Sequence, residues 1–193
     1  MSETKSKNTK LKIIEAGIQI LTKNPNASME EIATSIGLNR RTLHRYFNGK
    51  SGLLDEIAQY ACTICYQSTR NCIASHKQPE KQLKAMFYSD VNSGLKFQFL
   101  YSFYTSSDSM TETSKDYTEM MKLFRNVLKT LFSQGFFSSE TTLKWVENFY
   151  FSTIQAAITS ITIDDDIERI TIMDMAWSSF INGIVQDEIV NIN

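Results

Sequence analysis

Hydrophobic residues recur at helical spacing along most of the chain. From Thr9 to Lys23 they fall at every third or fourth position, which predicts an amphipathic helix that ends at Asn24-Pro25-Asn26. The residues before it, 1–8, are polar, and we expect them to be disordered. The same spacing predicts further helices over residues 51–76, 80–93, 95–106, 111–133, 138–161 and 167–188. The pattern therefore predicts an all-α protein.

Residues 28–50 contain two short helical stretches in close succession. Ser28 and Glu31 have the spacing of a capping box, which begins a helix. Gly37 ends this helix, and Asn39 caps a second helix, on which Leu43 faces the protein core. Two short helices joined by a tight turn at a glycine are the sequence form of a helix-turn-helix.

The outer face of the second helix is basic. At about 100° per residue, Arg41 and Arg45 fall opposite Leu43, and the neighbouring positions are also polar. Arginine can bind guanine in the major groove, whereas threonine and lysine can hold phosphate. A merely solvated face is the alternative for any one of these residues. The predicted DNA-binding residues are Arg40, Arg41, Thr42, His44, Arg45, Tyr46 and Lys50.

This stretch resembles the DNA-binding domain of TetR-type transcriptional regulators, whose pattern runs roughly xxIAxxxGVSxxTLYxYFxxKxxL. The matching residues are Ile32-Ala33, Gly37-Leu38-Asn39, Thr42-Leu43, Arg45-Tyr46-Phe47, Lys50 and Leu53-Leu54. The resemblance implies that Thr42, Tyr46 and Lys50 contact phosphates. It also implies that residues 40, 41 and 44 contact either bases alone or bases and phosphates together. His44 departs from the pattern, because the family usually has tyrosine there.

Length and charge suggest two domains. The 193 residues suffice for a helix-turn-helix DNA-binding domain over 1–50, sealed by the start of helix 51–76, and a helical ligand-binding and dimerisation domain over 51–193. Residues 1–50 hold nine Lys and Arg against four Asp and Glu, whereas the rest holds eleven against seventeen. A basic head on an acidic body indicates that double-stranded DNA binds at the head.

Lys5, Lys7 and Lys10 lie in the N-terminal segment and are candidates for a basic arm on DNA, with a solvated tail as the alternative. The same segment has no apolar core of the kind found in signal peptides. The chain also has no apolar run of 18 or more residues. We therefore expect a cytoplasmic protein with no membrane partner.

The last two long helices are apolar on more than one face. A helix that is apolar on two sides must bury both, so one side needs a second copy of the chain. Small residues such as Ser152, Ala156 and Gly183 allow close approach of helices. We predict a two-fold homodimer through these helices, forming a four-helix bundle, as the TetR resemblance also implies. A single intramolecular pair is the alternative.

The middle of the chain is rich in aromatic residues and methionine, most of which would form a core. TetR-like proteins usually hold a small-molecule pocket there, which implies aromatic walls and an apolar or planar ligand. Candidate wall residues are Phe87, Tyr88, Phe103, Tyr104, Met120, Phe124, Trp145 and Phe149. Candidate polar groups are Asp90, Asn92, Gln98, Asn148 and Gln155.

The remaining reactive residues favour structural roles. Cys62, Cys65 and Cys72 make an odd count, which indicates reduced thiols packed in the core, with thiol sensing as the alternative. The acidic run Asp164–Asp166 suits a helix N-terminus better than a metal site. We expect no metal and no cofactor.

The sequence also lacks a nucleophile elbow, a phosphate loop and paired histidines at metal spacing, so we expect no enzyme activity. It predicts a ligand-responsive repressor that binds a palindromic operator as a homodimer. The alternatives are a dimeric helix-turn-helix protein without a ligand, a DNA binder without sequence preference, and a helical enzyme.

Overall fold

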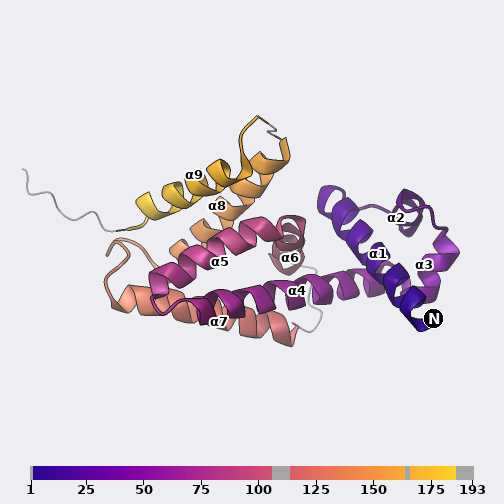
Figure 1. Cartoon of the computed structure of the whole chain (residues 1–193), viewed down its shortest axis with the longest axis horizontal. Helices are drawn as coiled ribbons and strands as arrows, with labels where there is room; N and C mark the ends of the chain where they lie inside the picture. Colours follow the sequence, from indigo (N-terminus) through magenta and orange to yellow (C-terminus); the bar gives the residue numbers. More distant parts are fainter. Residues whose placement is uncertain (1, 106–113, 164–165, 186–193) are drawn as a thin grey trace, which may run out of the picture. The chain divides into compact units, whose positions relative to one another are not determined.

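The computed structural model describes residues 2–105, 114–163 and 166–185, with side chains from residue 6 onward. These residues form nine helices and one isolated β-bridge, between Phe137 and Val185, which confirms the all-α prediction (Figure 1). The helices are α1 (Ser2–Lys23), α2 (Met29–Ser35), α3 (Arg40–Tyr46), α4 (Gly49–Ser75), α5 (Pro79–Ser93), α6 (Leu95–Thr105), α7 (Lys115–Ser133), α8 (Leu143–Ile163) and α9 (Arg169–Asn182).

The chain divides into two compact units. The first comprises Met1–Ile64 and Leu95–Asp116, and the second comprises Cys65–Gly94 and Tyr117–Asn193. This division differs from the expected boundary at residue 50, because the first half of α4 and all of α6 belong to the N-terminal unit. A helix-turn-helix alone is too small to bury its apolar residues, so these residues pack against the first half of α4 and against α6.

The core of the first unit is formed by residues from α1, α2, α3, α4 and α6. Leu43 from α3 and Leu53 and Ile57 from α4 are fully buried in it, and Phe99 from α6 is nearly so. A side-chain carbon placed on Gly17 of α1 would lie 2.5 Å from the Cδ1 atom of Ile57. Glycine at position 17 therefore permits the close crossing of α1 and α4.

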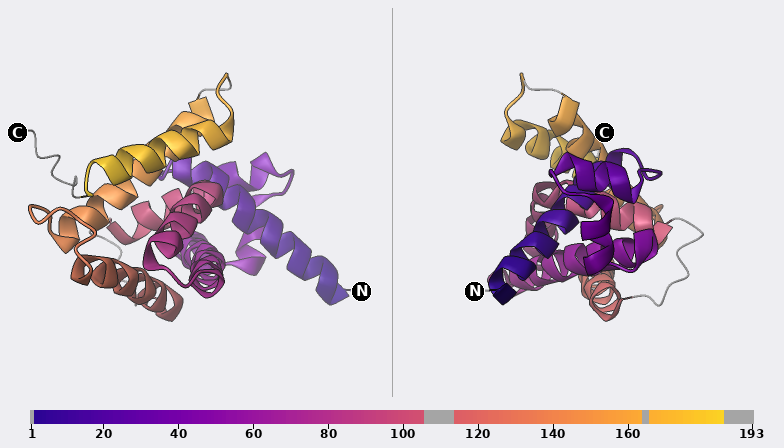
Figure 2. Two further views of the ribbon diagram at one scale, coloured as in Figure 1. Left: turned by 60° about the vertical axis from the view of Figure 1, so that its left-hand side comes forward. Right: turned by 90° about the vertical axis from the view of Figure 1, so that its right-hand side faces the viewer.

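The second unit is a helical bundle in which α8 packs against both α5 and α9. Both views of Figure 2 show α9 running beside α8. Aromatic rings fill the space between these helices: Phe87, Tyr150 and Phe180 are fully buried and contact one another edge-on or stacked. The core of this unit is therefore apolar, and a polar group inside it needs a hydrogen-bond partner from the protein.

Three predicted helix starts were wrong. Helix α1 begins at Ser2, because residues 2–8 contain no helix breaker and extend a helix already nucleated by its apolar face. Helix α4 begins at Gly49, two residues before the expected cap at Ser51. Helix α8 begins only at Leu143, where the Thr142 hydroxyl accepts from the backbone N–H of Trp145 at 3.2 Å.

The last helix, expected over 167–188, is α9 over Arg169–Asn182, and residues beyond 185 lie outside the described part. The predicted start of α7 near residues 111–113 and Asp164-Asp165 of the acidic run also lie outside it. Helices α5 and α6 lie where the sequence predicted them, to within a residue at either end.

Candidate nucleic-acid interface

Local hydrogen bonds fix the first helix of the helix-turn-helix. The Ser28 hydroxyl accepts from the backbone N–H of Glu31 at 3.2 Å, and the Glu31 carboxylate accepts from the backbone N–H of Ser28 at 2.6 Å. This reciprocal bonding confirms the predicted capping box. The bonds from Ser28 hold the pKa of the Glu31 carboxyl below its usual value. The carboxylate therefore stays charged at the positive end of α2.

The turn between the two helices depends on a glycine. Gly37 has a φ of +69°, in the left-handed region that other residues rarely adopt. Its N–H donates to the carbonyl of Thr34, and the N–H of Leu38 donates to the carbonyl of Ala33 at 2.9 Å. These two bonds form a Schellman motif, which ends α2 and aims the chain toward α3.

The second helix begins at a side-chain cap. The Oδ1 atom of Asn39 accepts from both the backbone N–H and the hydroxyl of Thr42, at 2.9 and 3.0 Å. The cap confirms the predicted start of α3 and occupies the Thr42 hydroxyl hydrogen. To donate a hydrogen bond to a DNA phosphate, the Thr42 hydroxyl would have to release the Oδ1 atom of Asn39.

The outer face of α3 is cationic. Arg40, Arg41, His44 and Arg45 are exposed, whereas Leu43 is fully buried. Thr42 and Tyr46 are half-buried at the margins of this face. Three guanidinium groups and an imidazole thus project into solvent from one short helix, as the helical spacing predicted.

Two contacts along α3 order these side chains. The Nε atom of Arg40 donates to Nε2 of His44 at 3.2 Å, one helical turn away. The guanidinium of Arg45 lies 5.2 Å from the ring centre of Tyr46, and its Nη2 atom is 3.4 Å from the phenol oxygen. The contact with Arg45 is the main cause that lowers the pKa of the Tyr46 phenol. Tyr46 therefore supports Arg45 in the protein without DNA.

Two lysines near the interface are engaged with protein. Lys50 Nζ donates to the carbonyl oxygen of Pro25 at 2.8 Å. Lys10 Nζ forms an ion pair of 2.8 Å with Glu56 and lies 5.8 Å from the centre of the Phe47 ring. Lys10 thus joins α1 to α4 and is not part of a free basic arm. Lys7 is exposed, and the side chain of Lys5 lies outside the described residues.

The predicted ligand-binding residues belong to both units. Phe103 and Tyr104 lie on α6 in the first unit, where Phe103 stacks on Phe99. The other six lie in the second unit, in different surroundings. Phe87 and Phe124 are buried in the core, whereas Trp145 is 57% exposed. Tyr88, Met120 and Phe149 are half-buried. The structure therefore divides the predicted set between core, surface and the other unit.

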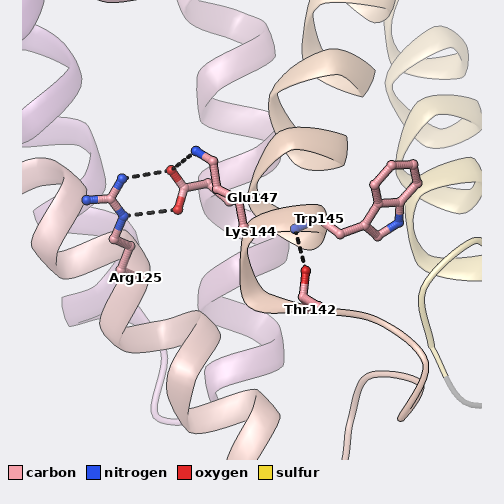
Figure 3. A network of polar contacts seen from close by, with 5 residues as sticks. All are labelled: Arg125, Thr142, Lys144, Trp145 and Glu147. Atoms are coloured by element: carbon pink, nitrogen blue, oxygen red, sulfur yellow. Dashed lines mark hydrogen bonds and ion pairs between the residues drawn. The ribbon is translucent and has the colours of Figure 1, made fainter.

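An ion pair between Arg125, which is partly exposed, and the buried Glu147 joins α7 to α8 and was missed by the sequence analysis. Arg125 donates from Nε and Nη2 to the two carboxylate oxygens of Glu147, at 3.0 and 2.8 Å (Figure 3). Lys144 adds a longer contact of 3.6 Å. Hydrogen bonding from Arg125 lowers the pKa of Glu147 and raises that of Arg125. In Figure 3 Trp145 points away from this network, on the other side of α8.

A second acid of this unit, Asp90, is half-buried, and no cation among the described residues is paired with it. The Tyr150 hydroxyl donates to Oδ2 of Asp90 at 2.8 Å, joining α8 to α5. Burial raises the pKa of Asp90 to about 7 and raises that of Tyr150 well above its usual value. The sequence analysis named Asp90 as a candidate polar group but gave no sign of its pairing with Tyr150.

The cysteines are free thiols, as predicted, with Cys62 and Cys65 buried and Cys72 half-buried. Burial raises the pKa of Cys62 to about 11, and burial also raises that of Cys72. Thiols with raised pKa values are poor nucleophiles at neutral pH. These side chains therefore act as apolar packing in this structure.

Comparison with known proteins agrees with the helix-turn-helix. Residues 13–57 match the family model described as bacterial regulatory proteins, tetR family. No curated protein matches the sequence. Within the described residues, no helix has both the length and the apolar character needed to cross a bilayer.

Solved structures of transcriptional regulators share the fold over nearly the whole chain. The ketosteroid transcriptional regulator KstR2 of Mycobacterium tuberculosis has a TM-score of 0.71 at 12% identity, covering 93% of this chain and 96% of that one. A TetR family regulator from Marinobacter aquaeolei VT8 has a TM-score of 0.71 at 16% identity, covering 96% and 99%.

The TetR-like regulator LfrR of Mycobacterium smegmatis, solved in complex with proflavine, has a TM-score of 0.64 at 19% identity, covering 93% of this chain and 98% of that one. Proteins of this family are regulators of transcription and not enzymes. The family match covers residues 13–57, and the solved structures show that this chain shares the fold of TetR-family regulators over nearly its whole length.

Proposed function

We propose that the protein is a repressor that binds a palindromic operator as a homodimer and releases it when a small molecule binds. The observation that carries this proposal is the outer face of α3. Arg40, Arg41, His44 and Arg45 are exposed on this face, whereas Leu43 is buried on the opposite face. A short helix with this face fits the major groove, where arginine can bond bidentately to guanine.

The contacts within the interface suggest a division of roles. Arg41 and Arg45 are exposed on the outer face of α3 and are assigned to bases. Thr42, Tyr46 and Lys50 lie at the margins of α3 and at the start of α4, where phosphate contacts would fix the orientation of the helix. Arg40 and His44 are assigned to mixed contacts.

The outward side of α8 supports the dimer. Its exposed residues after Lys144 include Trp145, Ser152 and Ala156, and the whole stretch from Asn148 to Ile163 carries no charged residue. On α9 Ile170 and Met175 are more than half exposed. An uncharged face of small and apolar side chains is unfavourable in water, and a second copy of the chain would bury it.

The ligand response belongs to the second unit. A ligand that prefers one dimer geometry would shift the population toward it, and the two copies of α3 would no longer match successive major grooves. Repression would then end. KstR2 and LfrR share this fold, and the LfrR structure contains proflavine, which is consistent with a small-molecule site in this chain.

Selection of duplexes from a random pool by the full chain tests the proposed function. We expect enrichment of one motif arranged as an inverted repeat. The variant Arg41→Ala/Arg45→Ala should enrich nothing, whereas Arg70→Ala, an exposed arginine on α4 outside the interface, should enrich the same motif. A pool that stays random with the unmodified protein would contradict the proposal and favour a DNA binder without sequence preference.

A further inference from the structure

Two of the exposed side chains on α3 are hydrogen-bonded to each other. The Nε atom of Arg40 donates to Nε2 of His44 at 3.2 Å. Residues four apart lie on the same face of a helix, one turn from each other. Both side chains are exposed, so the pair belongs to the outer face of α3 and not to the core.

The direction of this hydrogen bond defines the protonation of the imidazole. A guanidinium group has only donors, so Nε2 of His44 is the acceptor and carries no hydrogen. The neutral ring then has its hydrogen on Nδ1. In this arrangement His44 offers one donor, Nδ1–H, to a partner outside the protein.

The charged groups around His44 do not supply a counter-ion for it. On α3 they are the three arginines, and on α2, which packs against α3, they are Glu30 and Glu31. On α4 the first charged group is Lys50, which is bound to a backbone carbonyl. The ion pairs recorded among the described residues do not include His44. A proton added to the imidazole would therefore place one more unbalanced positive charge on α3.

The position of the pair on the helix suits contacts with bases. Arg40 is the first residue of α3, and His44 follows one turn later. In helix-turn-helix proteins the N-terminal residues of the second helix contact base edges in the major groove. The bond to His44 uses only Nε of Arg40, and the two terminal amino groups have the spacing of guanine O6 and N7. The Nδ1–H of His44 matches a purine N7 or a thymine O4 but not the amino group of cytosine.

We propose that Arg40 and His44 read DNA as one unit, in which Arg40 holds the imidazole as its Nδ1–H tautomer and this donor recognises an acceptor on a base. Arg40 is thus a positioning residue for His44 in addition to its own contact with DNA. The inference rests on the proposed function and refines the assignment of these two residues. The TetR pattern does not supply it, because the tyrosine usual at this position has no second ring nitrogen to accept from Arg40.

Acid should separate the two side chains. Histidine is the side chain whose charge normally changes between about pH 5 and about pH 8. An imidazolium has donors on both nitrogens and no acceptor, so it would lose the bond from Arg40. Reading of the base by His44 would then weaken, while the added positive charge would favour any phosphate.

NMR of the nitrogen-15-labelled full chain without DNA tests the role of Arg40. Long-range proton–nitrogen spectra of the imidazole rings distinguish the two neutral tautomers. The chain has two histidines, and the signal that disappears in His44→Gln belongs to His44. At about pH 8, where histidine is normally neutral, we expect the Nδ1–H tautomer.

Arg40→Met removes the donor and should shift His44 to the Nε2–H tautomer that free histidine prefers. Arg41→Met is the matched control, because it removes an exposed arginine from the same helix that makes no recorded bond to His44, and it should leave the tautomer unchanged. An Nε2–H tautomer in the unmodified protein would overturn the inference.

Competition between the selected duplex and its single-base variants tests the reading of a base. At about pH 8, His44→Phe should lower the discrimination at one base pair of each half-site roughly tenfold. Arg40→Met should lower it at the same base pair, because the reading tautomer is lost, and the double variant should lose no more there. All these substitutions replace exposed side chains, so the variants should fold.

The variant His44→Gln separates hydrogen bonding from protonation. Its amide can accept from Arg40 and donate to a base but does not titrate, so it should keep most of the discrimination at every pH. From about pH 8 to about pH 5.5, the discrimination of the unmodified protein should fall toward that of His44→Phe. Unchanged discrimination in His44→Phe, or losses at separate base pairs for Arg40 and His44, would overturn the inference but not the repressor proposal. A pool without an enriched motif would contradict the proposed function, and this inference with it.

Discussion

The Nζ atom of Lys50, in the first turn of α4, donates a 2.8 Å hydrogen bond to the carbonyl oxygen of Pro25, in the turn between α1 and α2. The bond joins the helix that follows the helix-turn-helix to the turn that precedes it. The ammonium group is therefore held in position before DNA arrives. A group positioned in advance loses less side-chain entropy when it binds a phosphate.

Lys50→Met should weaken binding to all duplexes by a similar factor, because a phosphate contact carries no sequence information. The slope of log affinity against log salt concentration should fall by about one. Fluorescence anisotropy with a specific and a scrambled duplex measures both effects. Lys129→Met, an exposed lysine on α7, serves as the control and should change neither. A loss confined to the specific duplex would show that Lys50 reads a base.

Removal of the proposed base contacts should lower the affinity for the specific duplex much more than the affinity for other duplexes. Arg41→Ala or Arg45→Ala should weaken binding to the selected duplex by roughly 1–3 kcal/mol for each lost base contact, with little effect on scrambled DNA. Competition assays with single-base variants of the duplex measure the change in specificity. If both duplexes lose affinity equally, these arginines bind phosphates and the assignment of α3 to base reading is wrong.

The Arg125–Glu147 pair should matter for stability. Arg125→Met leaves the carboxylate of Glu147 buried without its cation, and we expect a loss of about 1–3 kcal/mol of unfolding free energy, since the arginine end is open to solvent. Because the pKa of Glu147 is lowered in the folded state, this stabilisation is present above its usual value of 4.5 and disappears as the pH falls through the lowered value.

Urea unfolding of Arg125→Met at neutral and at acidic pH measures this contribution. Lys122→Met is the control, because Lys122 makes only an exposed pair of 3.7 Å with Glu119 on the same helix, worth under about 1 kcal/mol. Equal effects of the two substitutions would mean that burial of Glu147 adds nothing to its ion pair.

Asp90 should make the fold more stable in mild acid. Its pKa is raised from 3.8 to about 7, so the folded protein holds this proton more tightly than the unfolded chain does. The stabilisation is complete below about pH 4 and is lost as the pH rises toward 7. Asp90→Asn removes the ionisation, so its stability relative to that of the unmodified protein should rise between about pH 4 and about pH 7. Urea midpoints that shift in parallel for the two proteins would contradict this prediction.

The uncharged face of α8 predicts the effect of a charge placed on it. Ala156→Glu and Ser152→Glu substitute exposed residues, so the protomer should fold normally, but a dimer that buries this face would have to desolvate two carboxylates. Light scattering should then show a monomer at micromolar concentration, whereas the unmodified chain and Lys129→Glu should be dimers. A monomeric unmodified chain would remove the dimer proposal.

Local sequence patterns predicted the helix-turn-helix well. The Ser28–Glu31 capping box, the glycine turn and the Asn39 cap are each formed by hydrogen bonds between residues at most five apart, so their spacing in the sequence is nearly their geometry. The outward direction of Arg41 and Arg45 followed from the inward direction of Leu43 on the same helix.

Contacts between distant residues could not be predicted in the same way. Tyr150 and Asp90 are sixty residues apart, and their pairing depends on how α5 and α8 pack. Phe103 was predicted as a wall residue of the ligand site, and no sequence pattern indicated that α6, which carries it, packs with α1 in the first unit. Helical spacing predicts which side of a helix is apolar but not which helix covers it.

Hydroxyl-radical footprinting of the full chain on its selected duplex tests the central claim most directly, namely that two copies of α3 read one inverted site. We predict two protected segments of inverted sequence, with centres about one helical turn or a multiple of it apart, and loss of both with Arg41→Ala/Arg45→Ala. A single protected segment, or uniform protection along any duplex, would contradict the account.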